Sequence, residues 1–238
     1  MGKNCAYKQV NAAVWMKTLL VIWLLGCQGM SFPLAAQTSW RDSLSTLNRQ
    51  IALSPRSTDL RLRKAAVNIE LGQWDYAIEE YGRVLDIDAD NPAALYFRAY
   101  AYLHQRLPQM AQRDYERFLM RSPRHFEARI GLAMAKRQLG RSTDAMDQLN
   151  LLVEQYPDSA VAFAARADYE AELKLYDAAL FDWDEALRLQ PRNVSFVGAK
   201  IELLCTLRRY DEARHTIGEA LQRGVPTAAL KHWTDQLK

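Results

Sequence analysis

The chain carries apolar residues at helical spacing, and the pattern recurs at a fixed step. Between residues 160 and 193, apolar positions three and four apart mark one helix face, a turn follows at 175–177, and a second apolar face comes after it. Pro191 ends the unit, because proline lacks a backbone N–H and its ring clashes with the preceding helical turn. Each unit therefore predicts a hairpin of two helices.

The step is constant, and five units keep phase without an insertion. Alanine recurs where two helices of a hairpin must cross closely, a large apolar residue follows one helical turn later, and a mostly small residue stands on the preceding helix. These three sets are Ala77, Ala111, Ala145, Ala179 and Ala213; Tyr81, Tyr115, Leu149, Trp183 and Ile217; and Ala65, Ala99, Ala133, Ala167 and Ile201. Such an internal repeat predicts stacked units that share one continuous core.

The repeats divide most of the chain into regular segments. An amphipathic helix with Trp40, Leu44 and Leu47 on one face precedes the first unit and is interpreted as half a repeat. A terminal helix is expected at the other end, because a stack exposes an apolar surface unless something covers it. The predicted boundaries are 37–57 for the half-repeat helix, 58–225 for five repeats (58–91, 92–125, 126–159, 160–193 and 194–225), and 226–238 for the C-terminal capping helix.

Residues 1–36 have the features of a signal peptide. The apolar run Thr18–Gly26 is shorter than the roughly 20 residues of a membrane-spanning helix. Lys17 precedes this run, and Ala36 supplies a small residue for cleavage before Gln37. We therefore expect an exported protein, with the periplasm as its location.

Two details of this leader leave alternatives open. Met16 directly precedes a lysine and would serve as the start of translation, which would make residues 1–15 an extension introduced by the gene prediction. The segment Leu24–Cys27 resembles a bacterial lipobox, in which the cysteine is lipidated and becomes the N-terminus. The alternatives to cleavage are therefore a membrane-anchored lipoprotein, held through a lipid anchor at Cys27, and an uncleaved anchor.

The charge distribution argues against nucleic acid as a partner. The formal net charge is +3, and residues 1–36 contain three lysines and no acid. The remainder carries 28 basic and 28 acidic residues, with both signs interspersed. Nucleic-acid-binding proteins carry a basic face instead.

No constellation of residues predicts chemistry. The histidines lack a second ligand at metal-site spacing, and no glycine-rich phosphate loop occurs. Cys205 is expected to be an inert thiol on a helix. Asp182 and Asp184 flank Trp183 and are expected on a solvated face rather than in acid–base work. We therefore expect no enzyme activity, no cofactor, no metal site and no small-molecule substrate.

Over about residues 39–225 the chain resembles the tetratricopeptide repeat (TPR) family. The order small residue, glycine, alanine, aromatic residue recurs, for example at Ala65, Gly72, Ala77 and Tyr81. Departures occur at the turn, where Arg106, Lys174 and Arg208 replace glycine. The resemblance implies an all-α, right-handed superhelical solenoid of helix–turn–helix TPR hairpins, with about five full repeats, an N-terminal half repeat and a C-terminal capping helix.

The resemblance also implies a concave groove lined by the first helix of each hairpin. At the family's inward positions the chain is aromatic and apolar in its N-terminal half and acidic toward its C-terminus. The implied partner-binding residues are Leu62, Tyr96, Tyr100, His104, Ile130, Met134, Arg137 and Asp168.

Two functional hypotheses follow. The first is a non-enzymatic scaffold of the cell envelope that binds a protein or peptide segment in the concave groove. The second is an assembly subunit of an envelope complex, which would use its convex face or its ends, or a lipid-anchored version of the same scaffold.

Overall fold

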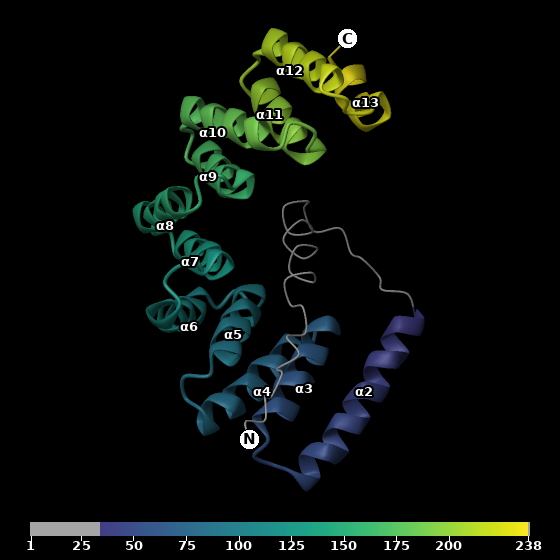
Figure 1. Cartoon of the computed structure of the whole chain (residues 1–238), viewed down its shortest axis with the longest axis vertical. Helices are drawn as coiled ribbons and strands as arrows, with labels where there is room; N and C mark the ends of the chain where they lie inside the picture. Colours follow the sequence, from purple (N-terminus) through teal and green to yellow (C-terminus); the bar gives the residue numbers. More distant parts are fainter. Residues whose placement is uncertain (1–33, 238) are drawn as a thin grey trace, which may run out of the picture. The chain divides into compact units, whose positions relative to one another are not determined.

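A computed structural model describes residues 34–237, with side chains placed from Trp40 onward. The predicted leader, including Met16 and Cys27, falls largely on residues 1–33 and lies outside the described residues. The chain divides into two compact units, Met1–Asp42 and Ser43–Lys238, and the repeats lie in the second. Throughout the described residues the regular structure is α-helical, which confirms the predicted fold class (Figure 1).

The helix before the repeats, α2, spans Leu34–Leu53. It begins three residues before Gln37, the expected mature N-terminus, because Ala35 and Ala36 are strong helix formers that extend it. It ends two residues before Pro55. No helix in the described part of the chain is long and apolar enough to cross a membrane.

Ten helices form five consecutive hairpins in the second unit. They are α3 (Thr58–Glu70) with α4 (Trp74–Ile87), α5 (Pro92–His104) with α6 (Pro108–Arg121), α7 (Phe126–Gln138) with α8 (Ser142–Gln155), α9 (Ala160–Glu172) with α10 (Tyr176–Leu189), and α11 (Val194–Thr206) with α12 (Tyr210–Gln222). A last helix, α13, spans Thr227–Gln236. Each first helix begins at the residue from which the sequence pattern counts its repeat.

Side-chain caps explain where the first helices begin. The residue before each one accepts a hydrogen bond from a backbone N–H three positions later, which satisfies a donor that the helix itself leaves unpaired. The capping residues are Ser57, Asn91, His125, Ser159 and Asn193. The second helices have no such cap, so the recurring cap is a property of the first helices.

The turn inside each hairpin holds one residue in the left-handed backbone region. Gly72 and Gly140 have φ of 67° and 71°, where glycine is favoured. Arg106, Lys174 and Arg208 occupy the same place in the other hairpins, with φ of 55°, 63° and 59°. These three departures from the family pattern therefore leave the turn unchanged, at a local cost of about 1–2 kcal/mol each.

The crossing alanines lie at the centre of the core. Ala77 and Ala179 are fully buried, and the large residue one turn later fills the wider part of the gap, as Tyr81 and Trp183 do. In the fifth hairpin the less regular residue Ile201 is also fully buried. Close approach of the helices therefore continues through all five repeats.

Ion pairs join the two helices within several hairpins. Arg98 donates to both carboxylate oxygens of Asp114 at 2.7 and 2.9 Å, and Arg166 does the same to Asp182 at 2.6 and 2.8 Å. In the first hairpin Lys64 lies 2.9 Å from Glu80. The base and the acid occupy equivalent positions of the repeat in all three hairpins, so the pairing has a fixed register. The third hairpin has Leu132 at the basic position.

The prediction that Asp182 lies on a solvated face was wrong. Its side chain is 1% exposed, whereas that of Asp184 is 59% exposed as expected. Adjacent residues on a helix point about 100° apart, so a residue beside Trp183 can still face the partner helix. Arg166 lies opposite on α9, and this recurring partner was overlooked in the sequence pattern.

The terminal helix α13 contacts both helices of the last hairpin. Leu230 is fully buried in the C-terminal core cluster, and Trp233 packs against it. The apolar end of the fifth repeat is therefore covered, as a stack requires.

Replacing Asp182 by alanine should destabilise the fold strongly. Removing one partner of a buried ion pair typically costs about 3–5 kcal/mol, and a loss toward the low end is expected because Arg166 keeps a hydrogen bond to Asn150 and lies 4.0 Å from Glu170. Asp184→Ala, two residues away in the same helix, is the matched control and should cost at most about 1 kcal/mol, since its pair with Lys200 is exposed on the acid side. Urea unfolding measures both, and equal losses would contradict the buried pair.

Deleting Thr227–Lys238 should cause local damage. Loss of the burial of Leu230 and Trp233 forfeits about 1.5–3 kcal/mol for each side chain. The main contacts of α13 are with α11 and α12, so amide protection in the first three repeats should persist while the fifth repeat frays. Hydrogen exchange monitored by mass spectrometry measures this, and an even loss of protection from α3 to α12 would rule out an additive stack.

Candidate functional site

The first helices of the hairpins form one surface of the second unit, here called the first-helix face. Figure 1 shows α5, α7 and α9 along one side and α6, α8 and α10 along the other. The residues of this face come from the fifth, ninth, twelfth and thirteenth positions of each repeat. The groove residues implied by the sequence all belong to this set.

An aromatic cluster joins the first two hairpins on the first-helix face. The His104 ring stacks on Trp74, with centroids 4.0 Å apart and planes 4° from parallel. Tyr100 meets both rings edge-on, at 6.0 Å from Trp74 and 4.6 Å from His104. All three side chains are half-buried, so each keeps part of its surface accessible. The structure thus brings Tyr100 and His104 together.

The environment of this cluster keeps its polar groups neutral. Burial, with a smaller effect from the negative charge of Glu70, raises the pKa of Tyr100 to about 12. Burial also lowers the pKa of His104. At neutral pH the cluster therefore presents uncharged aromatic surface with a hydroxyl and an imidazole at its edge.

Other implied residues contribute to packing. Tyr96 lies against the rings of Phe118 and His125, at 5.6 and 5.4 Å, and burial raises its pKa. Ile130 is 8% exposed and belongs to the core cluster that contains Leu149, so it lies inside the third hairpin rather than on an open groove. Half-buried Leu62 and Met134 pack against the N-terminal core.

Charged groups meet on the first-helix face between the third and fourth hairpins. Arg137 of α7 forms an ion pair with Glu172 of α9, and its guanidinium lies 5.6 Å from the Tyr169 ring centroid. Burial raises the pKa of Asp168 from 3.8 to about 6, and the nearby charge of Arg137 partly opposes that rise. Arg137 and Asp168 are therefore neighbours, as their register suggests.

No group of three or more His, Cys, Asp or Glu side chains that could hold a metal ion occurs in the described part of the chain. Burial and the neighbouring charge of Glu202 raise the pKa of the Cys205 thiol, which favours its unreactive protonated form.

Sequence reasoning missed the contribution of Trp74 to the aromatic cluster on the first-helix face. It is the first residue of α4, a second helix, and only the stacking of consecutive hairpins brings it to His104 at the end of α5. The sequence contained one signal for this contact: an aromatic residue stands at the turn of one repeat, and another ring stands at the end of the first helix of the following repeat.

Together these features define an α-helical repeat solenoid, a class of protein whose stacked hairpins expose an extended binding surface. Family models described as TPR repeat and tetratricopeptide repeat match residues 67–105 and 98–160. These two matches, which together span residues 67–160, identify tetratricopeptide repeats in this chain.

Curated relatives are distant. Tetratricopeptide repeat protein 16 from Homo sapiens is 24% identical over 203 residues, covering 79% of this chain and 23% of that protein, and the Macaca fascicularis protein gives the same values. The chain thus spans about a quarter of the length of these relatives.

Solved structures share the fold. A tetratricopeptide repeat protein from Parabacteroides merdae has a TM-score of 0.63 at 17% identity, covering 85% of this chain and 79% of that one. MamA has a TM-score of 0.59 at 20% identity, with 69% and 90% covered. YrrB, described as a TPR protein with an unusual peptide-binding site, has a TM-score of 0.56 at 14% identity, with 79% and 97% covered.

The raised pKa of Asp168 predicts a pH dependence of stability. The Asp168 carboxyl binds its proton more tightly in the folded state than in the unfolded chain. As pH rises from about 4 to about 6, the unfolded chain loses this proton first, so the free energy of unfolding falls over that range. Asp168→Asn cannot ionise, and its unfolding free energy relative to wild type should therefore rise over that range by on the order of 1 kcal/mol and then level off.

Urea unfolding at intervals between pH 4.5 and 7.5 measures this difference. Both proteins retain Glu170, whose pKa burial raises to about 7, so its contribution cancels in the comparison. A difference that stays constant with pH would show that Asp168 titrates alike in the folded and unfolded states.

Proposed function

We propose that this chain is a non-enzymatic scaffold that binds a segment of a partner protein along the first-helix face. The observation that carries this proposal is the cluster of Trp74, Tyr100 and His104. Core rings such as Tyr81 and Tyr115 are at most 2% exposed, whereas the three clustered rings are only half-buried. Aromatic side chains held rigidly at a surface supply contact area with little loss of conformational entropy, which is typical of binding hot spots.

The groups farther along the face suit an extended ligand. Each hairpin adds one set of groove positions, so a segment lying across the first helices meets aromatic rings first and the Arg137, Glu172 and Asp168 group later. The partner is therefore a protein or peptide with apolar and charged side chains along its length. The peptide-binding site named for YrrB, a protein of the same fold, supports this class of ligand.

The cell envelope is the proposed location, with the periplasm favoured by the leader features of residues 1–36. A lipid anchor at Cys27 is the alternative. Mass spectrometry of the mature protein distinguishes them: an N-terminus at Gln37 supports cleavage and export, whereas a lipidated N-terminal Cys27 supports the anchored form. An unprocessed N-terminus would contradict both.

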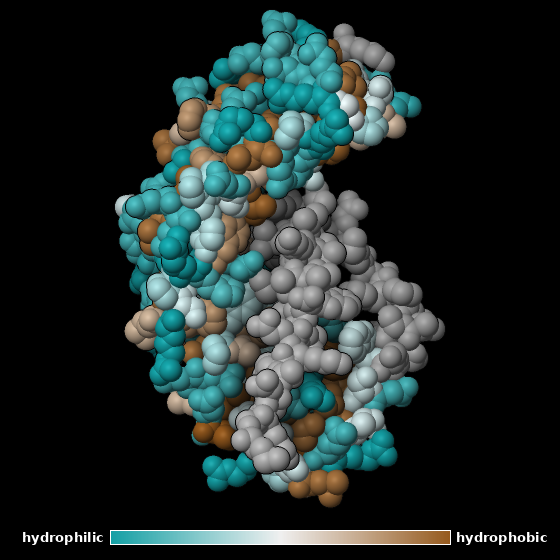
Figure 2. All heavy atoms as spheres, viewed as in Figure 1, coloured by the Kyte–Doolittle hydropathy of each residue, from teal (hydrophilic) through white to brown (hydrophobic). Residues whose placement is uncertain are grey.

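A second candidate function is assembly through the second helices. Two large apolar residues of second helices are exposed, Met120 of α6 at 77% and Phe181 of α10 at 62%. Figure 2 shows apolar residues scattered among hydrophilic ones over α8–α12 in the visible view. Exposed apolar side chains can mark an interface.

Selection of displayed random peptides on the purified protein tests which side binds. Peptides that bind should lose at least tenfold in affinity to Tyr100→Ala, a change of about 1.4 kcal/mol. Phe181→Ala, on a second helix, is the control and should leave the affinity unchanged. Fluorescence polarisation measures both, with circular dichroism to verify folding. Loss of affinity in Phe181→Ala alone would move the binding surface to the second helices.

A further inference from the structure

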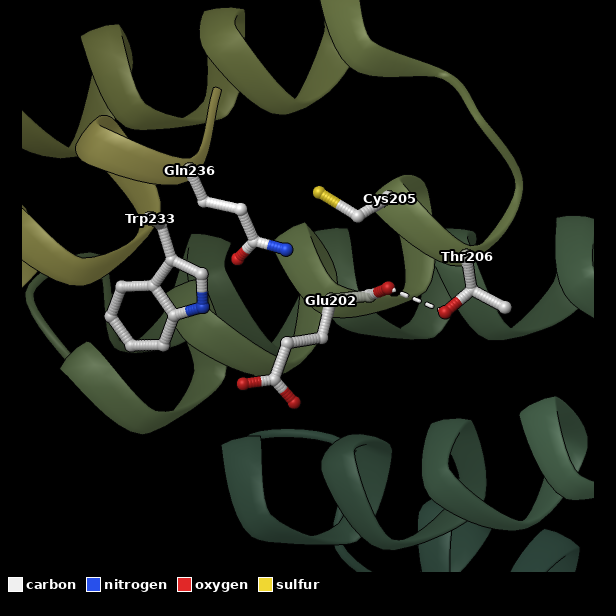
Figure 3. A pocket seen from close by; sticks show the side chains of 5 residues that line it. All are labelled: Glu202, Cys205, Thr206, Trp233 and Gln236. Atoms are coloured by element: carbon white, nitrogen blue, oxygen red, sulfur yellow. Dashed lines mark hydrogen bonds between the residues drawn. The ribbon is translucent and has the colours of Figure 1, made fainter. Parts of the chain in front are cut away.

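A pocket of about 350 Å³ lies between the first helix of the last hairpin and the terminal helix. Glu202, Cys205 and Thr206 line it from α11, and Trp233 and Gln236 line it from α13 (Figure 3). Its volume falls at the small end of the roughly 300–1,000 Å³ typical of ligand pockets. Because α11 belongs to the first-helix face, the pocket extends that face to its C-terminal end.

Gly198 allows the indole of Trp233 to form one wall of this pocket. A Cβ atom at Gly198 would overlap Cζ2 of the Trp233 ring, so the tryptophan lies directly against the α11 backbone. The corresponding positions of the other repeats carry Leu62, Tyr96, Ile130 and Ala164, each of which has a side chain there. The contact of glycine with tryptophan is therefore particular to the last repeat.

The indole N–H of Trp233 is an unsatisfied donor at this pocket. Its Nε1 is enclosed by protein and has no hydrogen-bond acceptor among the described groups. Figure 3 shows this nitrogen on the side of the ring that faces Gln236 and Glu202. A buried donor without an acceptor is unfavourable, so the indole lies at a place where the protein does not satisfy its own polar group.

The charge at the pocket is negative. Glu202 is exposed and is the only charged residue of the lining, while burial and, to a smaller extent, Glu202 raise the pKa of the Cys205 thiol. Thr206 donates its hydroxyl to the backbone carbonyl of Glu202 at 2.8 Å. One repeat earlier, Asp168 occupies the position equivalent to Glu202. A ligand that reaches this end of the face therefore meets carboxyl groups.

We infer that this pocket is a subsite for a basic residue, lysine or arginine, of the bound segment. The cationic head pairs with Glu202 and the aliphatic stem lies along the Trp233 ring. The Gln236 amide provides a hydrogen-bond donor for the backbone carbonyl of the same residue. The inference rests on the proposed peptide-binding function, and it adds the charge of the ligand and the end of the face at which that charge lies.

The same geometry excludes a carboxylate-bearing ligand at this end. Glu202 would repel an acidic side chain or a C-terminal carboxylate, and none of the lining residues carries a positive charge to compensate. An uncharged side chain of equal length would keep the contact with the indole and lose the ion pair. The test therefore compares a basic, an uncharged and an acidic ligand.

The test titrates the full-length protein with N-acetyl-arginine methylamide and observes the Trp233 indole N–H by NMR, assigned through its loss in Trp233→Phe. The norleucine and glutamate analogues are the uncharged and acidic probes. We expect a saturable shift with the arginine probe, at least tenfold weaker binding of the norleucine probe, and no binding of the glutamate probe. Equal affinity for the arginine and norleucine probes would overturn the inference.

Two variants test whether Glu202 causes the preference for the arginine probe. Glu202→Gln, at an exposed position, should weaken the arginine probe at least tenfold to the level of norleucine, and an unchanged affinity would again overturn the inference. Asp211→Asn removes an exposed acid of α12 that does not line the pocket, and it should change the affinity less than twofold. A comparable loss in Asp211→Asn would show attraction by general negative charge, without a defined subsite.

The probe and the displayed peptides separate the two proposals. If peptides bind through Tyr100 but the arginine probe gives no shift and selected peptides are not enriched in basic residues, the subsite is wrong while the scaffold function stands. If the arginine probe binds as expected but no peptide is selected, the subsite stands and the peptide-binding function fails.

Discussion

The structure depends on one constraint: a two-helix hairpin cannot bury its apolar face alone and must share it with its neighbours. Close crossing is possible because the residue at each crossing is alanine, buried to 0% exposure at Ala77, Ala111, Ala179 and Ala213. The large side chains one turn later then fill the space between successive hairpins. The first-helix face exists because this packing repeats without an insertion, so that equivalent positions of successive repeats lie on the same side.

Buried ion pairs add a second level of order and influence the surface charge. Arg98 and Arg166 turn inward to Asp114 and Asp182, and their charges are therefore committed to pairs between helices of one hairpin. Replacing such a pair by apolar residues can be neutral or stabilising, and the third repeat has Leu132 and Gln148 at the two positions, so the pairs are better read as fixing helix register. Because these two arginines are paired inside their hairpins, carboxyl groups dominate the exposed charge toward the C-terminal end of the first-helix face.

The two ends of the first-helix face differ in chemistry. Near the N-terminal repeats, stacking across hairpins creates uncharged aromatic surface around Trp74, Tyr100 and His104. At the other end, the capping helix adds Trp233 and Gln236 to a pocket beside an acidic residue. A helix that covers the apolar end of the stack thus also extends the first-helix face. A ligand with apolar residues at one end and a basic residue at the other would be held in a single direction.

The sequence by itself determined the repeat length, the helix pairs, the crossing alanines and the burial of residues such as Tyr115, because period and side-chain size are local properties of the chain. It placed Tyr100 and His104 on the face but could not show that Trp74 completes their cluster. Three features were decided only by the tertiary structure: the place of Trp74 in the cluster, the burial of Asp182, and the contact between Gly198 and Trp233. Each depends on which side chain of one helix lies opposite which side chain of another, and helix periodicity alone does not specify that relation.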